Sequence, residues 1–92
     1  MSRLNCDELL VILQEECAEV SQIISKIHRY GLRGYNPITS EYNDDLLHKE
    51  IGDLLCMIEL CIEKRLLNED ELTVHIKQKR EKLKKWSNLD HE

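Results

Sequence analysis

Apolar residues recur every three to four positions along most of the chain, a spacing that is typical of amphipathic helices. The first such stretch covers residues 5–30. Asn5 is a suitable N-cap, Glu8 follows it at the position of a capping box, and Gly31 provides a C-terminal stop. The pattern therefore predicts one long helix in the first third of the chain.

Two further helices are predicted downstream. One runs from about residue 44 to residue 66, with Asp44 or Asp45 as its cap. The other begins after Asn68, carries acidic residues in its first turn and continues to about residue 86. Residues 87–92 are expected to form a frayed tail. Because no segment shows the alternation of a strand, the fold class that we expect is all-α.

The segment 31–43 separates the first two predicted helices. It holds two of the three glycines and the only proline of the chain, so a helix cannot continue through it. A loop of about a dozen residues is long for a small domain, and long loops often carry function. We therefore expect this loop to take part in the activity of the protein.

The chain is short for a self-sufficient unit. Its 92 residues make one domain, residues 1–92, and a chain of this size buries only about 60% of its surface on folding. Apolar residues also span well over half the circumference of the second helix, which is more than one partner helix can cover. We therefore expect a bundle of three main helices completed by homo-oligomerisation, with a tetramer favoured over a dimer.

Charge and composition narrow the range of partners and compartments. The net charge of −5 argues against nucleic acid polymers and anionic membranes as partners. No apolar run approaches the ~20 residues that span a bilayer, and the polar segment 1–8 does not resemble a secretory signal.

The four cysteines, at positions 6, 17, 56 and 61, lack Cys-x-x-Cys spacing. They indicate buried free thiols in a reducing, cytoplasmic environment.

Two of the predicted helices carry carboxylates inside their apolar stripes. Glu16 lies within the first stripe and Glu19 at its edge, whereas Glu50 lies within the second and Asp53 at its margin. The stripes consist of Leu9, Leu13, Val20, Ile23 and Ile27, and of Leu47, Ile51, Leu54, Leu55, Ile58 and Ile62. Burial of an unpaired carboxylate is unfavourable by several kcal/mol. Two such pairs on facing helices predict a shared cation, and four hard oxygen donors suit Mg²⁺, with Mn²⁺ as a substitute.

Two other interpretations explain acids in a helical core. Ion pairs with Lys or Arg would make the protein a helical interaction module without chemistry. A di-iron bundle would require Glu-x-x-His on two helices, and the nearest approach here is Asp45-x-x-His48. Adding Mg²⁺ to a melting experiment separates a metal site from ion pairs.

A basic residue interrupts the apolar stripe of the third predicted helix. Lys79 lies among Leu72, Ile76, Leu83 and Trp86, within a run of six basic residues between Lys77 and Lys85. Lys79 could contact a phosphate held on the metal, or it could neutralise one of the buried acids. The spacing leaves both roles open.

The acidic motifs resemble those of a known family. The run Glu15-Glu16-Cys17-Ala18-Glu19 and the later Glu50-Ile51-Gly52-Asp53 resemble the E-E-x-x-E and E-x-x-D signature of the MazG-like all-α nucleoside triphosphate pyrophosphohydrolases. The short forms common in bacteriophages are the most similar. The likeness extends to residues 14–31, 51–55 and 79–86, segments that are spread over most of the chain.

The resemblance implies hydrolysis of a (deoxy)nucleoside triphosphate to a monophosphate and pyrophosphate, for nucleotide-pool control or house-cleaning, by a helical homo-oligomer. It implies that Glu16, Glu19, Glu50 and Asp53 bind Mg²⁺. A metal-bound water would attack the α-phosphorus, with Glu16 or Glu19 orienting it or taking its proton.

Substrate contacts are expected from basic and aromatic side chains. Lys79, Arg80, Lys26 or Arg29 would hold the charge of the pyrophosphate. Trp86, Tyr30 or Tyr35 could stack on the base, and Asn36 or Asn68 could contact its edge. The thirty residues between Glu19 and Glu50 slightly exceed the usual spacing, and the excess lies in the loop 31–43.

Overall fold

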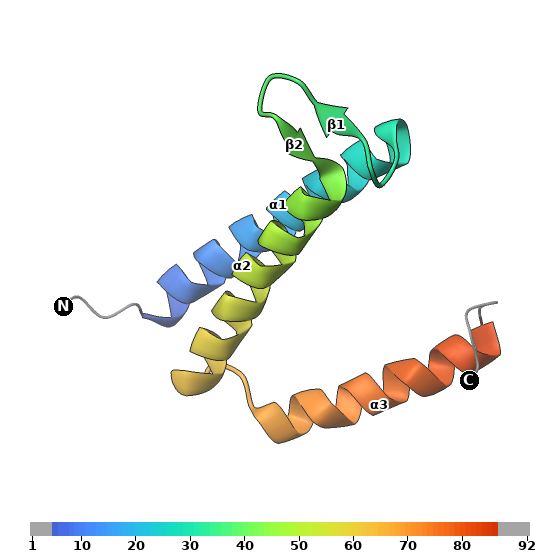
Figure 1. The fold of residues 1–92 in the computed structure, drawn as a ribbon. Helices are drawn as coiled ribbons and strands as arrows, with labels where there is room; N and C mark the ends of the chain where they lie inside the picture. The colour runs from blue at the N-terminus through green and yellow to red at the C-terminus, as the bar shows by residue number, and fades with distance from the viewer. Residues whose placement is uncertain (1–4, 87–92) are drawn as a thin grey trace.

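The computed structural model describes residues 5–86 and is mostly helical (Figure 1). The elements follow in the order α1 (Cys6–Tyr30), β1 (Tyr35–Asn36), β2 (Glu41–Tyr42), α2 (Asn43–Glu63) and α3 (Glu69–Trp86). Three helices are present, as the periodicity predicted. The tail predicted for residues 87–92 lies outside the described residues.

Both ends of α1 are set by the residues that the sequence singled out. The Asn5 side chain accepts a hydrogen bond from the Glu8 backbone N–H at 2.8 Å. Gly31 follows the helix with φ of +90°, a conformation that L side chains rarely adopt, and its N–H donates to the Ile27 carbonyl at 2.7 Å. The predicted cap and stop are therefore confirmed.

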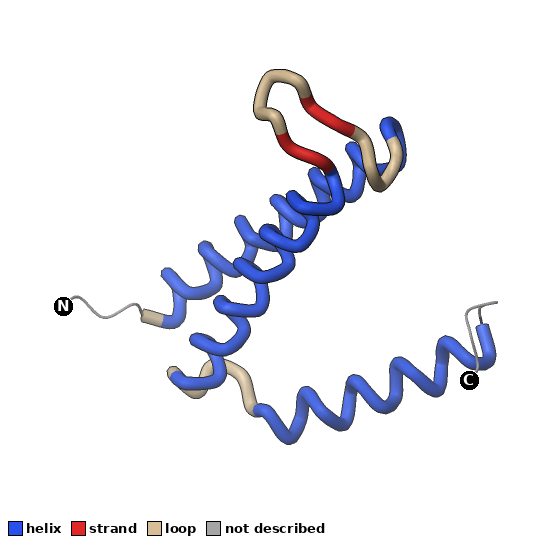
Figure 2. The backbone as a smooth tube through the Cα atoms, viewed as in Figure 1, coloured by secondary structure: helices blue, strands red, loops and turns tan. Residues whose placement is uncertain are grey.

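The segment between α1 and α2 contains a short antiparallel hairpin, which Figure 2 shows as two strand segments between the helices. Tyr35 pairs with Tyr42, and Asn36 pairs with Glu41. The rings of Tyr35 and Tyr42 lie 5.0 Å apart. The expectation that this segment holds no strand was wrong. Strands of two residues each are too short to show a period-two pattern in the sequence.

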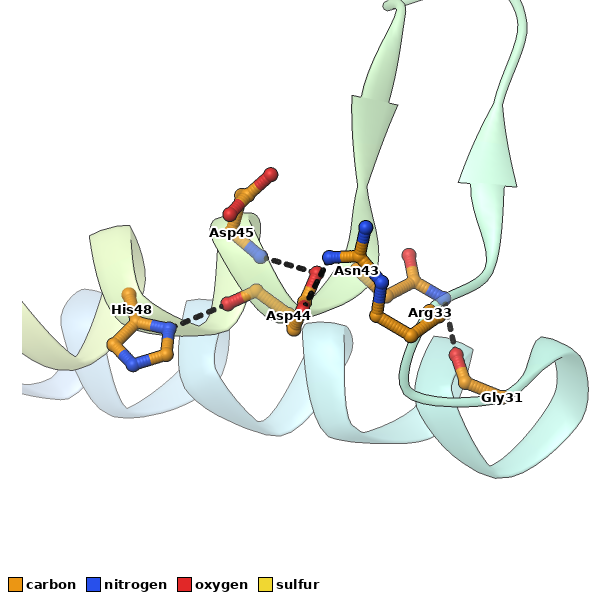
Figure 3. Close-up of polar contacts among 6 residues, drawn as sticks. All are labelled: Gly31, Arg33, Asn43, Asp44, Asp45 and His48. Atoms are coloured by element: carbon orange, nitrogen blue, oxygen red, sulfur yellow. Dashed lines mark hydrogen bonds and ion pairs between the residues drawn. The ribbon is translucent and has the colours of Figure 1, made fainter.

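The start of α2 also differs from the prediction. The helix begins at Asn43 rather than after an aspartate cap, and Tyr42 precedes it without a side-chain cap bond. The reason is that Asn43 holds the base of the hairpin. Its backbone N–H donates a hydrogen bond to the Gly34 carbonyl at 2.8 Å, and its side-chain Nδ2 donates one to the Gly31 carbonyl at 3.0 Å. Figure 3 shows this side chain reaching back to Gly31. The helix ends at Glu63, three residues before the predicted end.

The core lies between α1 and α2, which run side by side in opposite directions (Figure 1). Leu9, Met57 and Cys61 form its buried cluster, and Ile23 is buried further along α1. The face of α2 that packs on α1 is therefore centred on Met57 and Cys61. The apolar pattern of the sequence predicts a face centred about one residue position away, with Leu55 inside it. Leu55 is in fact 54% exposed.

α3 leaves the helix pair after a turn at residues 64–68 (Figure 1). Asn68 caps it by accepting from the Glu71 N–H at 3.0 Å, as its position predicted. None of its residues is buried, and Val74, Ile76 and Trp86 are each more than half exposed. The radius of gyration is 16.3 Å, against about 12 Å for a compact chain of this length. One copy of the chain therefore does not close into a three-helix bundle.

All four cysteines are free, but only Cys61 is buried. The expectation of free thiols is confirmed, and the expectation that they are buried was wrong for Cys6, Cys17 and Cys56. These three lie outside the buried cluster that α1 and α2 form around Leu9, Met57 and Cys61. Within residues 5–86, no helix is both long enough and apolar enough to cross a membrane.

Candidate metal centre and neighbouring pocket

Three of the predicted metal ligands converge between α1 and α2. Glu16 lies midway along α1, and Glu50 and Asp53 lie one turn apart on α2. One carboxylate oxygen from each lies within 4.8 Å of the other two. Glu16 and Glu50 are both partly buried, with the Glu50 side chain 17% exposed. The Asp53 side chain is 47% exposed. The centre is therefore sunk into the seam on one side and open to solvent on the other.

Glu19, the fourth predicted ligand, lies at the rim of this centre. It follows Glu16 by one turn on α1, and its side chain is exposed. It is not part of the close group of three, but its negative charge acts on Glu16. The structure thus places Glu19 beside the centre rather than inside it.

The electrostatics of the centre are unfavourable for three ionised acids. Partial desolvation raises the pKa of the Glu16 carboxyl above its ordinary value of 4.5. The negative charges of Asp53 and Glu50 raise it further. The positive charge of Lys49 acts in the opposite direction but does not reverse the shift. The cluster therefore carries an excess of negative charge that a cation would relieve.

Lys49 is the nearby cation that sequence reasoning missed. Its Nζ lies 3.3 Å from Asp53 Oδ2 and 3.6 Å from Glu50 Oε1. The hydrogen bond to Asp53, and then the charges of Asp53 and Glu50, raise the pKa of Lys49. Its i, i+4 spacing to Asp53 was the signal that could have revealed it. Because Lys49 forms ion pairs only with Glu50 and Asp53, it leaves Glu16 without an ion-pair partner among the described residues.

The chemistry of the donor set fits a hard divalent cation. The three groups offer only carboxylate oxygens, and no thiol or imidazole belongs to the cluster. Mg²⁺ and Mn²⁺ prefer such oxygen ligands, and Mg²⁺ commonly keeps several waters beside one or two carboxylates. The half-exposed side of the centre at Asp53 leaves room for those waters and for phosphate oxygens.

The predicted substrate residues fall into two groups. Lys79, Arg80 and Trp86 lie on α3, which diverges from the helix pair, so one copy of the chain does not bring them to the acids (Figure 1). Lys26 and Arg29 lie instead on the last two turns of α1, close to the hairpin.

A pocket of about 360 Å³ lies between the end of α1 and the hairpin. α1 contributes Lys26, Arg29 and Tyr30 to its wall, and the hairpin contributes Tyr35 and Asn36. The Arg29 guanidinium carbon lies 5.5 Å from the centre of the Tyr30 ring. Neither Lys26 nor Arg29 forms an ion pair within the described part of the chain. The pocket therefore combines two cations, two aromatic rings and an amide.

Two residues that sequence reasoning did not assign to the site hold this pocket in shape. Asn43 is buried and bridges the turn at Gly31 and Gly34. A Cβ at Gly34 would lie 2.7 Å from the Tyr30 carbonyl oxygen and 2.8 Å from Asn43 Nδ2, so the turn requires glycine there. The two glycines three residues apart, after a helix and before a polar helix start, were the available signal.

No family model matches the chain, and neither curated proteins nor solved structures gave a match. The nucleotide-hydrolysing activity that the resemblance implies therefore stays a prediction.

Proposed function

We propose that the protein is a metal-dependent nucleoside triphosphate pyrophosphohydrolase. The observation that carries the proposal is the convergence of Glu16, Glu50 and Asp53 within 4.8 Å in the seam between α1 and α2. These residues belong to the two sequence motifs on which the family resemblance rests, although thirty residues separate the motifs. The excess negative charge at Glu16 gives the cluster a physical need for a cation.

The roles of the acids follow from their positions. Glu16, Glu50 and Asp53 would hold Mg²⁺ or Mn²⁺, which when bound supplies charge neutralisation at phosphate oxygens and lowers the pKa of a coordinated water. Glu19 lies one turn away, exposed and without an ion-pair partner among the described residues. Glu19 is therefore suited to orient the attacking water and to take its proton, with Glu16 as the alternative base.

Neutralisation of the leaving pyrophosphate is assigned to α3 of a second copy of the chain. Six basic residues, including Lys79 and Arg80, lie between positions 77 and 85 of α3, opposite in charge to the acidic seam. Val74, Ile76 and Trp86 on α3 are each more than half exposed in one copy. On α2, Leu47, Ile51 and Leu55 line an open apolar groove. A homo-oligomer in which α3 packs on a neighbouring helix pair covers both surfaces and brings Lys79 to the acids.

The decisive test is Glu50→Gln, with Glu59→Gln on an exposed position of the same helix as the matched control. Pyrophosphate release from each standard ribo- and deoxyribonucleoside triphosphate is measured with Mg²⁺, and circular dichroism reports the helix content. We expect Glu50→Gln to lose turnover while staying helical, because it removes one ligand charge without removing the side chain. Retained turnover in Glu50→Gln would contradict the proposed metal-dependent activity.

The position of attack distinguishes this activity from that of a phosphatase. Hydrolysis in ¹⁸O-water is expected to label the nucleoside monophosphate, because the activated water attacks the α-phosphorus and pyrophosphate leaves. Label in free phosphate together with a nucleoside diphosphate product would mean attack at the γ-phosphorus. That result would contradict the proposed reaction.

One observation favours a second candidate function, a helical interaction module without chemistry. Lys49 contacts both Glu50 and Asp53, so part of the acidic charge is compensated within the chain. In that case Mg²⁺ would not change the melting temperature. The metal-dependent enzyme should instead melt at a higher temperature with millimolar Mg²⁺, because a ligand that binds only the native state stabilises it.

A further inference from the structure

The pocket beside the hairpin and the acidic centre lie along one line on the helix pair. Lys26 in the pocket follows Glu19 by seven residues on α1, and Asn43 at the pocket precedes Glu50 by seven residues on α2. Seven residues are two helical turns, so each pair shares a face of its helix and is separated by about 10 Å along the axis. Both helices therefore direct the pocket and the centre to the same side of the molecule.

The wall of the pocket suits a planar heteroaromatic ring attached to an anion. Tyr30 is 69% exposed and Tyr35 is 51% exposed, so each ring has a free face. Asn36 uses its Oδ1 to accept from the Ile38 N–H at 2.9 Å, which leaves its amide nitrogen to donate to a ring nitrogen or carbonyl oxygen. Lys26 lies on the side of the pocket nearer to the acids, where the sugar or the first phosphate would pass.

The floor of the pocket is fixed before any ligand binds. The Gly34 N–H donates to the Gly31 carbonyl at 3.0 Å, and Asn43 closes the same turn from α2. Arg33 and Asp44, joined at 2.6 Å, hold the hairpin base to α2 from outside (Figure 3). A site that is built in advance loses less conformational freedom on binding.

We propose that this pocket binds the base and sugar of the nucleotide while the acidic centre holds its phosphates. The inference rests on the proposed function and assigns the base to Tyr30 and Tyr35 rather than to Trp86. An extended nucleoside triphosphate has a length comparable to the two helical turns between pocket and centre. The bases stack on the tyrosine rings, and Lys26 contacts the part of the ligand between the base and the triphosphate.

The experiment compares a triphosphate ligand that carries a nucleoside with one that lacks it. Dissociation constants are measured by calorimetry with Mg²⁺ for the four α,β-imido deoxynucleoside triphosphates, which resist hydrolysis, and for inorganic tripolyphosphate. The variants are Tyr30→Ala, with Tyr30→Phe as its ring-retaining partner, and Lys26→Met, with Lys64→Met as an exposed control just after the end of α2. Tyr30 is mostly exposed at the last position of α1, so its removal leaves the core unchanged. Hydrolysis of unmodified triphosphates is followed in parallel.

We expect Tyr30→Ala to weaken nucleotide binding about tenfold, because an aromatic side chain that stacks on a base contributes a factor of that order to the affinity. Tyr30→Phe should restore the affinity, Lys26→Met should weaken it, and tripolyphosphate affinity should not change in the Tyr30 variants. Unchanged nucleotide affinity in both Tyr30→Ala and Lys26→Met would overturn the base pocket, while persisting hydrolysis would leave the proposed function intact. A wild-type protein that neither binds nor hydrolyses nucleotides would overturn both.

Discussion

The most informative residues of this protein are acids in places where apolar side chains belong. Glu16 lies on the stripe of α1 that packs against α2, and its pKa is raised by partial desolvation and by the acids facing it. Natural helices seldom keep a charged group in such a position without compensation. The unfavourable negative charge that these acids place between α1 and α2 is therefore a reason to propose a metal site there.

Removal of one of these charges should stabilise the metal-free protein. With EDTA at pH 7, Glu16→Gln is expected to melt a few degrees above the wild type, because it relieves repulsion from Asp53 and Glu50. Glu15→Gln, one position away and exposed, serves as the control and should leave the melting temperature unchanged. A Glu16→Gln protein that melts below the wild type would show that the carboxylate is compensated.

The ion pair between Arg33 and Asp44 stabilises the fold in a pH-dependent way. The hydrogen bond from Arg33, followed by the positive charge of Arg33, lowers the pKa of Asp44 below its ordinary value of 3.8. The neighbouring Asp45 adds negative charge near Arg33, and His48 Nδ1 contacts the Asp44 carbonyl at 2.7 Å. Because the folded-state pKa is lowered, the stabilisation is fully present above pH 3.8 and is lost as the pH falls through the folded value.

Asp44→Asn is therefore expected to lower the melting temperature slightly at pH 7 and not at all near pH 2. The Arg33 side chain is 64% exposed, so solvent screens the pair and the effect at pH 7 is small. Melting curves from pH 2 to pH 7 measure it, with Glu41→Gln in the hairpin as the control. A difference between wild type and Asp44→Asn that stays constant over this range would contradict the assigned role of the pair.

At the scale of elements, the sequence predicted what local signals specify and missed what tertiary contacts decide. The caps at Asn5 and Asn68 and the stop at Gly31 depend on neighbouring residues only, and all three are confirmed. The start of α2 depends on Asn43 bonding to a turn twelve residues earlier, which no local pattern encodes. The orientation of α2 was missed because apolar side chains surround most of that helix, so several faces could pack on α1.

In the candidate site, too, local patterns revealed some residues and tertiary contacts determine the others. Glu16, Glu50 and Asp53 could be found from helical periodicity because Glu16 and Glu50 interrupt apolar stripes and Asp53 lies at the margin of one. The pocket could not be found in this way, because its wall combines the end of α1 with a hairpin whose two-residue strands have no periodicity. Tyr35 in particular faces Lys26 and Arg29 only after the turn at Gly34 reverses the chain.

The turn at Gly34 gives an element-scale prediction. Gly34→Ala would bring a Cβ to 2.7 Å from the Tyr30 carbonyl oxygen, so either the end of α1 or Asn43 must shift. We expect a loss of about 1–3 kcal/mol of stability, typical of overpacking, together with weaker nucleotide binding. Urea titration measures the loss, and Thr39→Ala at the exposed hairpin tip is the control. Wild-type stability in Gly34→Ala would mean that the turn is more adaptable than its hydrogen bonds indicate.

At the scale of the whole molecule, one copy leaves two complementary surfaces without cover. α3 presents apolar side chains beside its basic residues, and the groove on α2 lies on the face not used by α1. A short chain with this much exposed apolar surface is expected to associate with further copies.

Light scattering at micromolar concentration should therefore give the mass of a homo-oligomer, with a tetramer favoured over a dimer. Leu55→Glu places a charge in the α2 groove and should reduce the mass, because the buried charge opposes association. Leu32→Glu is a matched control, since Leu32 is 53% exposed and Leu55 54% exposed in one copy. A wild-type monomer would contradict the assembly.

The assembly can also be tested through activity, because α3 cannot serve the acids of its own copy in this arrangement (Figure 1). Glu50→Gln lacks a metal ligand and Lys79→Met lacks the cation for the pyrophosphate, so each variant alone should be nearly inactive. After the two variants are mixed, unfolded and refolded together, half of the sites have intact acids. Half of those receive an intact Lys79 from a Glu50→Gln copy. Activity should therefore return to about one quarter of the wild-type value for a symmetric oligomer with random mixing. If Lys79 acted on the acids of its own copy, every site would lack one of the two groups, and the mixture would stay as inactive as its components.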